Sequence, residues 1–431
     1  MPFSAIPVSW GILGLLGGAS ATAFSAGWAL ARTIAGSQID TLKHEVAFAR
    51  QRADTLDVDL EKLKARYENA ERLIITKSHE NAKLLADLQA ISVQRQSDEG
   101  LRVQLQVVEG LQVRLAKYEQ LSTALMGSED EVWNLREAAP PTEFEIRMRE
   151  RKLKVCTIIN LKGGVGKTTL VANLAAYFAK KHGKKVLVID FDYQGSLTRM
   201  MVLGAQIPLG SSILSDTLLG GEVDGKRAAQ LGRELGATLP GMRLITSGQT
   251  FDGFENRTLL RWLLGDTADD VRFRLADVLL SPEMAKEFDL VLIDAPPRLS
   301  TGAMNALCAS HAILVPTILD ALSVDAVGRF LQRVNIFRKL NPALEFAGVI
   351  GTLTEQDRLK PNERDALDDA KAALAYWQGR GYAFERNVRH FSLLARAAGK
   401  EIGYLQSGRN GREVRAVFDE LGAQILQKVP L

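Results

Sequence analysis

The stretch NLKGGVGKTT, residues 160 to 169, holds the residues of this chain that are best able to do chemistry. It joins an apolar, β-branched run, LKVCTIIN (153–160), to an amphipathic helical pattern that stops before Gly183. A strand that delivers glycines to a helix N-terminus presents backbone N–H groups and the positive end of the helix dipole to a phosphate. The residues expected to bind the nucleotide phosphates are Gly163, Gly164, Val165, Gly166, Lys167, Thr168 and Thr169.

Two residues of this loop have more specific expected roles. The Lys167 ammonium would reach the β- and γ-phosphates, and the Thr168 hydroxyl would ligate Mg²⁺. Two later strand-like runs end in acids: VLVID ends at Asp190, two residues before Asp192, and FDLVLID ends at Asp294. Asp294 is the acid expected to hold Mg²⁺ through water. An Asp-x-Asp pair alone is also typical of a solvated turn, and its position after the glycine loop favours the metal-site interpretation.

The glycine stretch departs from the common GxxxxGK[ST] pattern, because Leu161 stands where the first glycine would be and Lys162 begins the loop. Here the chain resembles the ParA/MinD family of P-loop ATPases, whose deviant Walker A signature is KGGxGK[ST]. The resemblance implies ATP as the nucleotide and a homodimer that sandwiches ATP, with Lys162 reaching the nucleotide of the partner subunit. A positive charge supplied in trans stabilises the transferring phosphoryl group and couples hydrolysis to dimerisation.

Other segments follow the same family in order. Residues 186–198 resemble its DxDPQGxxT segment, which implies that Asp192 orients the attacking water and Asp190 supports the Mg²⁺ shell, while Tyr193 replaces the usual proline. The run AILVPT around Pro316 resembles the strand and loop that contact the base. Residues 386–405 resemble the closing segment of the family, although Leu393 stands where an acid is expected. The expected catalytic residues are Lys162, Lys167 and Asp192, and the expected metal ligands are Thr168, Asp190 and Asp294.

The fold class follows from the order of these elements. Strands and helices alternate with short connections, which predicts an α/β domain with a mostly parallel, doubly wound sheet and a ligand at the carboxyl ends of the strands. We expect this P-loop ATPase domain at residues 153–431, with the resemblance covering about 153 to 428.

The N-terminal residues predict a membrane span. No side chain from Met1 to Leu30 is charged, and the apolar run Ile6–Ala31 is long enough to cross a bilayer as one helix. A buried core helix and a signal peptide are the alternatives, and the latter lacks a positive segment before the apolar run. Basic residues follow the run from Arg32 onward, so we expect a single-pass protein of the inner membrane with its ATPase domain in the cytoplasm. Residues 1–36 form this predicted transmembrane segment.

Residues 37–126 carry a heptad pattern. Apolar residues recur every seven positions from Ile39 to Leu88, and a second series lies three residues further on, which predicts a coiled coil that helps dimerisation; one amphipathic helix packed on a domain is the alternative. Residues 101–115 fit either a β-hairpin or a continued helix. The stretch GSEDEVWNLREAAPP has the turn formers of a linker, which we place at 127–152.

Composition agrees with an ordered protein of two or three domains. The net charge is +3, with acidic residues in excess before residue 150 and basic residues in excess after it, a weak attraction to polyanions that decides nothing alone. Cys156 and Cys308 lie in apolar runs, which favours buried thiols in a reducing compartment over a disulfide or metal site.

Together these features predict a membrane-anchored ATPase that uses ATP binding and hydrolysis as a switch to position or regulate DNA or a protein complex, with an activating protein partner. Arg386, Arg389 and Arg396 are candidates for non-specific DNA binding, and solvated surface charge is the alternative. A tyrosine-kinase-like regulator of envelope polysaccharide export is disfavoured because no tyrosine follows Tyr404. A non-hydrolysing membrane scaffold is the third hypothesis.

Overall fold

The computed structural model describes residues 72, 75–87, 105–113, 116, 119 and 129–428, except 209, 211–212, 357, 374–382, 392–393 and 395–400. Its contacts divide the chain into two units, Met1–Ala116 and Lys117–Leu431. The predicted membrane span, residues 1–36, lies outside the described residues. Among the helices that are described, none combines the length and apolar character needed to cross a bilayer.

The first unit is helical where it is described. Residues 75–87 and 105–113 are α-helix, so the β-hairpin alternative for 101–115 is wrong for the described residues of that segment. Ile75, Leu84 and Val113 are each at least half exposed within this single chain, at 52%, 50% and 58%. The coiled coil of residues 37–126 stays a prediction.

The second unit is built on an eight-stranded sheet with the order β3-β4-β2-β5-β1-β6-β7-β8. Each neighbouring pair is parallel except β3 with β4, and this confirms the predicted mostly parallel sheet. The central strands β2 and β5 are buried at every residue, as expected for a parallel sheet covered on both faces. The strands are β1 (Lys154–Ile158), β2 (Val186–Asp190), β3 (Arg233–Glu234), β4 (Met242–Ile245), β5 (Leu290–Asp294), β6 (Ala312–Ile318), β7 (Glu345–Thr354) and β8 (Val388–Arg389).

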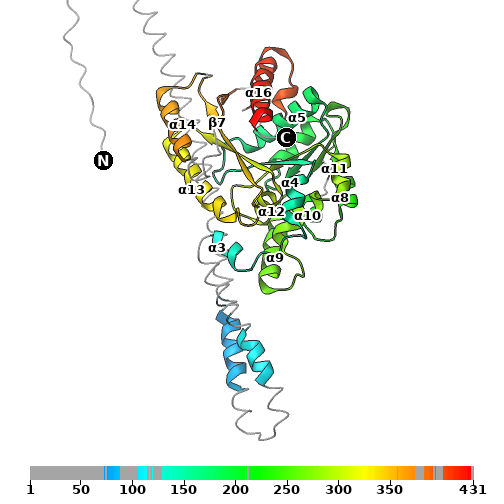
Figure 1. The fold of residues 1–431 in the computed structure, drawn as a ribbon, viewed down its shortest axis with the longest axis vertical. Helices are drawn as coiled ribbons and strands as arrows, with labels where there is room; N and C mark the ends of the chain where they lie inside the picture. Colours follow the sequence, from blue (N-terminus) through cyan, green and yellow to red (C-terminus); the bar gives the residue numbers. More distant parts are fainter. Residues whose placement is uncertain are drawn as a thin grey trace, which may run out of the picture. The chain divides into compact units, whose positions relative to one another are not determined.

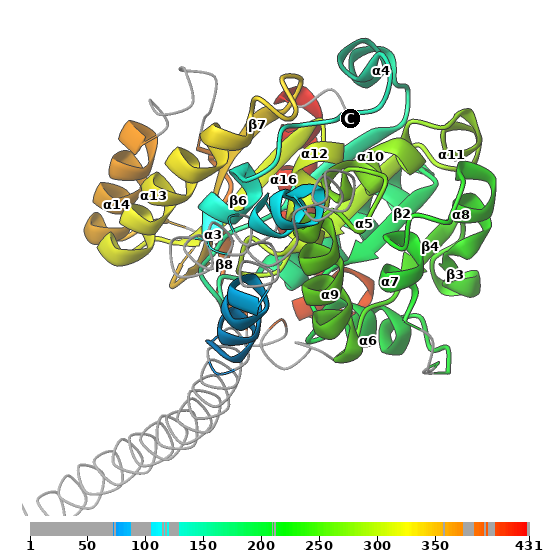
Figure 2. The same ribbon diagram turned by 90° about the horizontal axis from the view of Figure 1, so that it is seen from below.

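Helices cover both faces of the sheet (Figure 1). One core joins alternate residues of the strands to α5, α6 and α16, and the other joins the remaining residues to α9, α10, α12 and α13. Seen from below, α13 and α14 lie together at one edge and α8 and α11 at the other (Figure 2). The helices of this unit are α3 (Glu129–Asn134), α4 (Phe144–Glu150), α5 (Lys167–His182), α6 (Ser196–Gly204), α7 (Leu214–Leu218), α8 (Gly225–Leu231), α9 (Thr250–Leu264), α10 (Arg274–Leu279), α11 (Pro282–Glu287), α12 (Thr301–Ala309), α13 (Ala321–Phe337), α14 (Pro361–Ala373) and α16 (Gly408–Lys428), and the short 3₁₀ turns are η1 (Gly236–Thr238), η2 (Val271–Phe273) and η4 (Gly403–Leu405).

The predicted linker at 127–152 is wrong for the residues from 132 onward. Trp133, Phe144 and Met148 are buried in the core of the ATPase unit, at 1%, 5% and 0% exposure. The Trp133 ring lies 5.9 Å from that of Trp262, and the Phe144 ring packs edge-on against Phe273. Burying these large apolar side chains stabilises the domain, so α3 and α4 are part of it.

Both cysteines are free and buried, as the sequence predicts. Cys156 lies in β1 and Cys308 in α12. Burial raises the pKa of the Cys156 thiol to about 12, and it also raises the pKa of Cys308. Both thiols therefore stay protonated at neutral pH and are poor nucleophiles.

Candidate functional site

The glycine loop begins where β1 ends and is fixed there by Asn160. The Asn160 side chain donates to the carbonyl of Pro316, at 2.8 Å, and accepts from the backbone N–H of Lys162, also at 2.8 Å. One amide therefore joins the start of the loop to β6. Pro316 itself is buried within β6, and its carbonyl is engaged by Asn160.

The middle of the loop is open on one side. A Cβ atom added to Gly163 or Gly164 would meet no atom within 4 Å, and Gly164 and Gly166 have φ angles of +74° and +83°. These angles favour glycine, and the exposed backbone can approach a phosphate closely. Below the loop, the Thr352 hydroxyl donates to the Val165 carbonyl at 2.8 Å and holds the loop from β7. The geometry therefore fits a phosphate cradle at the N-terminus of α5.

Lys167 is the first residue of α5 and is largely buried. Its ammonium donates to the carbonyls of Asn160 and Lys162, each at 3.1 Å. Burial lowers the pKa of Lys167, and the nearby carboxylates of Asp294 and Asp192 act in the opposite direction. The ammonium is thus held inside the glycine loop, where it would meet a bound phosphate.

Asp294 ends β5 beside the start of α5. One of its carboxylate oxygens accepts the Thr168 hydroxyl at 2.7 Å, and the other has no hydrogen-bond partner among the described residues. Burial and then the charge of Asp190 raise the pKa of Asp294 well above its usual range, while the Thr168 hydrogen bond opposes this. A buried carboxylate with an unused oxygen is costly unless a cation compensates it.

These donors fit Mg²⁺. It prefers oxygen ligands and usually takes one or two carboxylates together with phosphate oxygens and water. Thr168 and Asp294 supply a hydroxyl and a carboxylate side by side at the phosphate cradle. Within the described residues, no group of three or more His, Cys, Asp or Glu side chains forms an all-protein metal cage. The arrangement matches a cation that reaches the site together with a nucleotide.

Asp190 pairs in register with Asp294 on the neighbouring strand. Its carboxylate accepts three hydrogen bonds, from the N–H of Asp192 at 3.0 Å and from the N–H and hydroxyl of Thr198 at 2.8 and 2.7 Å. Burial raises the pKa of Asp190 to about 7, and the Thr198 hydrogen bonds oppose that effect. The structure thus uses Asp190 to fix the start of α6, which leaves Thr168 and Asp294 better placed for a metal.

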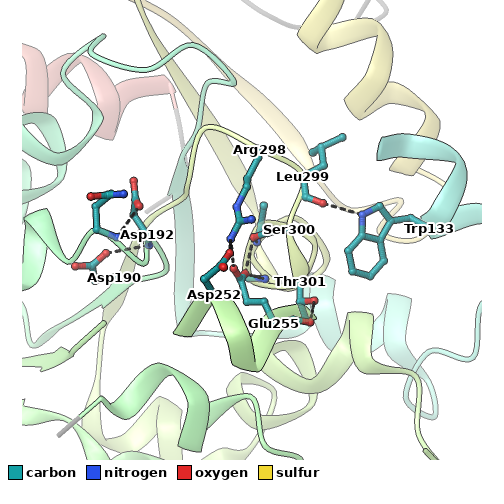
Figure 3. Close-up of polar contacts among 12 residues, drawn as sticks. Trp133, Asp190, Asp192, Asp252, Glu255, Arg298, Leu299, Ser300 and Thr301 are labelled. Atoms are coloured by element: carbon teal, nitrogen blue, oxygen red, sulfur yellow. Dashed lines mark hydrogen bonds and ion pairs between the residues drawn. The ribbon is translucent and has the colours of Figure 1, made fainter. Parts of the chain in front are cut away.

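Asp192 lies in a tight turn directly after β2. Its side chain accepts the N–H of Gln194 at 3.0 Å, and its carbonyl accepts the N–H of Gly195 at 2.9 Å. Asp192 is half-buried, and its charge acts on Lys167, so it lies near the glycine loop. Figure 3 shows Asp192 close to Asp190, with Arg298 reaching from the loop after β5 to Asp252 and Glu255.

Lys162 contacts its own chain in this structure. Its ammonium donates to the Ser323 hydroxyl at 2.5 Å and lies 3.9 Å from the Asp320 carboxylate. Asp320 in turn caps α13 by accepting the N–H of Ser323 at 2.7 Å. The side chain of Lys162 is 36% exposed, so its end lies near the surface.

The predicted DNA-binding arginines pair with acids of α16. Arg386 lies 3.3 Å from Glu420, and Arg389 donates to Glu413 at 2.9 Å. Arg396 lies outside the described residues. These ion pairs partly neutralise Arg386 and Arg389, and DNA binding by the three arginines stays a prediction.

Some residues of the site were not predicted. Asn160 positions both Lys162 and Lys167, and its place directly before the loop is the signal that could have found it. No local motif identifies Ser323 or Glu255, because each is far away in sequence from the residue that it contacts at the site.

Comparison with known proteins agrees with this geometry. A family model described as an AAA domain matches residues 153–346. The chain is 32% identical over 247 residues to the chromosome partitioning protein ParA of Caulobacter vibrioides, a match that covers 56% of this chain and 84% of that protein. It is 31% identical over 221 residues to the chromosome-partitioning ATPase Soj of Thermus thermophilus, which covers 51% of this chain and 77% of that protein.

A solved structure supports the same fold. Apo McdA from Cyanothece superposes with a TM-score of 0.51 at 19% identity, and the match covers 63% of this chain and 99% of that one. The glycine loop, the acids that end β2 and β5, and the identity to ParA over most of its length lead to one assignment: this chain belongs to the ParA family of P-loop ATPases.

Proposed function

We propose that the chain binds Mg·ATP at the loop of residues 162–169 and hydrolyses it as a homodimer. The observation that carries this proposal is the buried Asp294 carboxylate, which has one oxygen on Thr168 and the other unused beside an open glycine loop. Such a group destabilises the free protein and suits a site that a cation and a nucleotide complete.

The residues of the loop would bind the triphosphate. Backbone N–H groups of Gly163 to Thr169 would surround the phosphates, and the Lys167 ammonium would exchange its two carbonyl contacts for phosphate oxygens. Thr168 and Asp294 would hold Mg²⁺, which supplies positive charge against the β- and γ-phosphate oxygens. The half-buried Asp192 would orient the attacking water.

We propose that Lys162 acts in trans. It would leave Ser323 and Asp320 of its own chain and reach the nucleotide of the second subunit, where its charge stabilises the transferring phosphoryl group. The Lys162 and Asp320 side chains are 36% and 46% exposed, which supports this, because a partly exposed ion pair is broken at little cost.

Nucleotide binding and phosphate release by the purified full-length chain test the first part. We expect Lys167→Ala to weaken Mg·ATP binding by about 100-fold or more, since a charge-assisted contact is lost. Lys180→Ala, on an exposed turn of the same helix, is the matched control. Unchanged binding by Lys167→Ala would contradict the site.

Asp192 tests hydrolysis separately from binding. Asp192→Ala should bind Mg·ATP normally and hydrolyse it about 10² to 10⁴-fold more slowly, as for loss of a group that positions the reacting water. Asp266→Asn, an exposed acid after α9, should behave like the unsubstituted protein. The same comparison distinguishes an enzyme from a non-hydrolysing scaffold. The unsubstituted chain of a scaffold would not hydrolyse ATP, so Asp192→Ala would cause no decrease.

Complementation tests the trans role. Lys162→Ala and Asp192→Ala chains should each be inactive alone and regain hydrolysis when co-expressed, because a mixed dimer has one site with Asp192 from one chain and Lys162 from the other. If Lys162 acts within its own chain, no mixed site is complete and no activity returns.

We further propose that the ATP-bound dimer positions DNA or a protein complex, in the inner membrane, with an activating protein partner. The names of the ParA and Soj relatives support a role in partitioning, and the apolar run Ile6–Ala31 supports the membrane. Pull-down from solubilised membranes with the Asp192→Ala variant, with and without ATP, tests both. Capture of neither DNA nor protein would contradict the positioning role.

The tyrosine-kinase alternative gains no support from the structure. Tyr404, the last tyrosine of the chain, is 6% exposed and donates its hydroxyl to Asp419 at 2.7 Å. A buried, hydrogen-bonded hydroxyl is a poor phosphate acceptor.

A further inference from the structure

The turn that carries Asp192 is a β-turn with tyrosine at its second position. The Asp192 carbonyl accepts the N–H of Gly195 at 2.9 Å, so Tyr193 and Gln194 are the two central residues. Proline is favoured at this second position because its ring fixes φ before the turn forms. Tyrosine has no such restraint, so the turn needs another source of rigidity.

Arg298 contacts the tyrosine ring from the neighbouring loop. Its guanidinium carbon lies 5.1 Å from the centre of the Tyr193 ring, within the range of a cation–π contact. Tyr193 is half-buried and packs against the core on its remaining side. The ring is therefore held between the core and a fixed cation.

The guanidinium is fixed because two acids of α9 hold it. Arg298 donates to Asp252 at 2.6 Å and to Glu255 at 2.9 Å, and the Glu255 side chain is only 2% exposed. Such charge-assisted hydrogen bonds to partly buried acids restrict the arginine to one orientation. Figure 3 shows this side chain extended from its loop toward both acids.

Glu255 also fixes the loop from which Arg298 extends. It accepts the Ser300 hydroxyl at 2.5 Å and the N–H of Gly302 at 2.7 Å. That loop begins at Asp294, so α9 holds the segment after the proposed metal ligand. Arg298 thereby connects two loops, one carrying Asp192 and the other following Asp294.

From this geometry we propose that Arg298 is a positioning residue for hydrolysis, which acts through Tyr193 to replace the rigidity that proline would give the Asp192 turn. The proposal rests on the proposed ATPase function, and in particular on the role of Asp192 in orienting water. Misplacing such a group by about 1 Å can reduce a rate by about 10²-fold. The proposed nucleotide contacts lie in the loop of residues 162–169, so binding should not change.

A double-mutant cycle in the full-length chain tests this coupling. Arg298→Gln should reduce kcat by about 10- to 100-fold while the Kd for Mg·ATP stays within about threefold. In a Tyr193→Pro background, where φ is restrained by the ring, the same substitution should change kcat by less than about threefold. If Tyr193→Pro does not fold, Tyr193→Ala replaces it, and Arg298→Gln should then add no further loss.

Two results would overturn the proposal. One is an unchanged kcat in Arg298→Gln, and the other is an equal loss in the Tyr193→Pro background, which would mean that Arg298 acts by a route other than Tyr193. Arg274→Gln is the matched control, because Arg274 is also held by an acid, Asp269, and is largely buried. It should lower thermal stability without lowering kcat.

Amide hydrogen exchange gives a measurement that does not depend on hydrolysis. Arg298→Gln should speed exchange at the Gly195 amide, which closes the turn, and should not do so when Tyr193 is proline. If Arg298→Gln had the same effect on exchange at the Gly195 amide with tyrosine and with proline at residue 193, the coupling would be refuted. If the unsubstituted chain fails to bind or hydrolyse ATP, the proposed function fails, whereas the exchange result still decides whether Arg298 orders the turn.

Discussion

Two buried ionic clusters of the ATPase unit are satisfied to different degrees. Arg272 is 1% exposed; it donates twice to Asp270 and also donates to the carbonyls of Trp133 and Glu137. Asp294 is equally buried but has an oxygen without a partner among the described residues. The first cluster compensates its own burial and holds residues 133–137 on the domain. In the second cluster the Thr168 hydroxyl and the Lys167 charge only partly oppose the effect of burial on Asp294, which favours a site that a ligand completes.

The largest expected effect comes from removing the uncompensated charge. Asp294→Asn should reduce Mg²⁺-dependent hydrolysis by about 10³-fold, because a metal ligand is lost. It should leave the free energy of unfolding unchanged or raise it, since a buried charge disappears while the Thr168 contact can remain. Hydrolysis assays and thermal unfolding of the same samples measure both. A large decrease in the free energy of unfolding would instead indicate that Asp294 stabilises the fold.

The opposite result is expected for the compensated cluster. Arg272→Met should destabilise the protein by about 3 to 5 kcal/mol, because Asp270 is left charged and buried. Chemical unfolding measures the loss. The double variant Arg272→Met/Asp270→Asn should recover part of it, and Mg·ATP affinity at low temperature should not change. If the double variant were as unstable as Arg272→Met alone, the unpaired charge of Asp270 would not be the cause of the lost stability.

A third group, the partly buried His311, extends the comparison to the pH dependence of stability. His311 accepts the N–H of Val155 at 3.1 Å, and burial followed by the charges of Arg151 and Lys154 lowers the pKa of His311 to about 3. The unfolded chain therefore binds a proton at higher pH than the folded one. Stability from this group is complete above about pH 6.5 and falls toward pH 3, by up to about 1.4 kcal/mol per pH unit.

His311→Asn isolates that contribution, since the asparagine oxygen can accept the same N–H. Unfolding free energies measured from pH 7 to pH 4 should fall less steeply in the variant than in the unsubstituted protein. Parallel slopes would show that His311 is not the group responsible.

The smallest effect is expected at the link between the two regions. The Trp133 indole N–H donates to the carbonyl of Leu299 at 2.8 Å, in the loop that follows Asp294 (Figure 3). Trp133→Phe keeps an aromatic ring and should cost about 1 kcal/mol of stability. Phe144→Leu, in the same core but away from that loop, is the control. Hydrogen exchange at residues 298–300 should rise only in Trp133→Phe, and an equal rise in both variants would indicate general loosening.

Much of the ATPase fold was predictable because its signals are local. The run VLVID forms β2 and LVLID forms β5 as expected, and α5 ends at His182, directly before Gly183, whose φ is 62°. The glycine loop and Asp294 likewise follow from spacing. These elements depend on neighbouring residues and on burial across both faces of a parallel sheet.

The features that could not be predicted are contacts between residues that are far apart in sequence. Trp133 lies in a stretch with turn formers and paired prolines, and its burial depends on Trp262 and Leu299 more than 120 residues away. The resemblance implied that Asp190 supports the Mg²⁺ shell, which stays a prediction, whereas the hydrogen bonds that its carboxylate accepts from Asp192 and Thr198 were not predicted. Arg298 contacts Tyr193, Asp252 and Glu255, all of which lie more than 40 residues away in sequence.

The way α3 joins the ATPase unit also has a mechanical consequence. A force applied to Glu129 from its N-terminal side would act on the ATPase unit through α3, where Trp133 contacts Leu299 and Arg272. The loop containing Leu299 would experience such a force directly, because one hydrogen bond joins it to the indole. Tension on α3 would thus be delivered to the segment that follows Asp294, the residue that accepts the Thr168 hydroxyl at the start of α5.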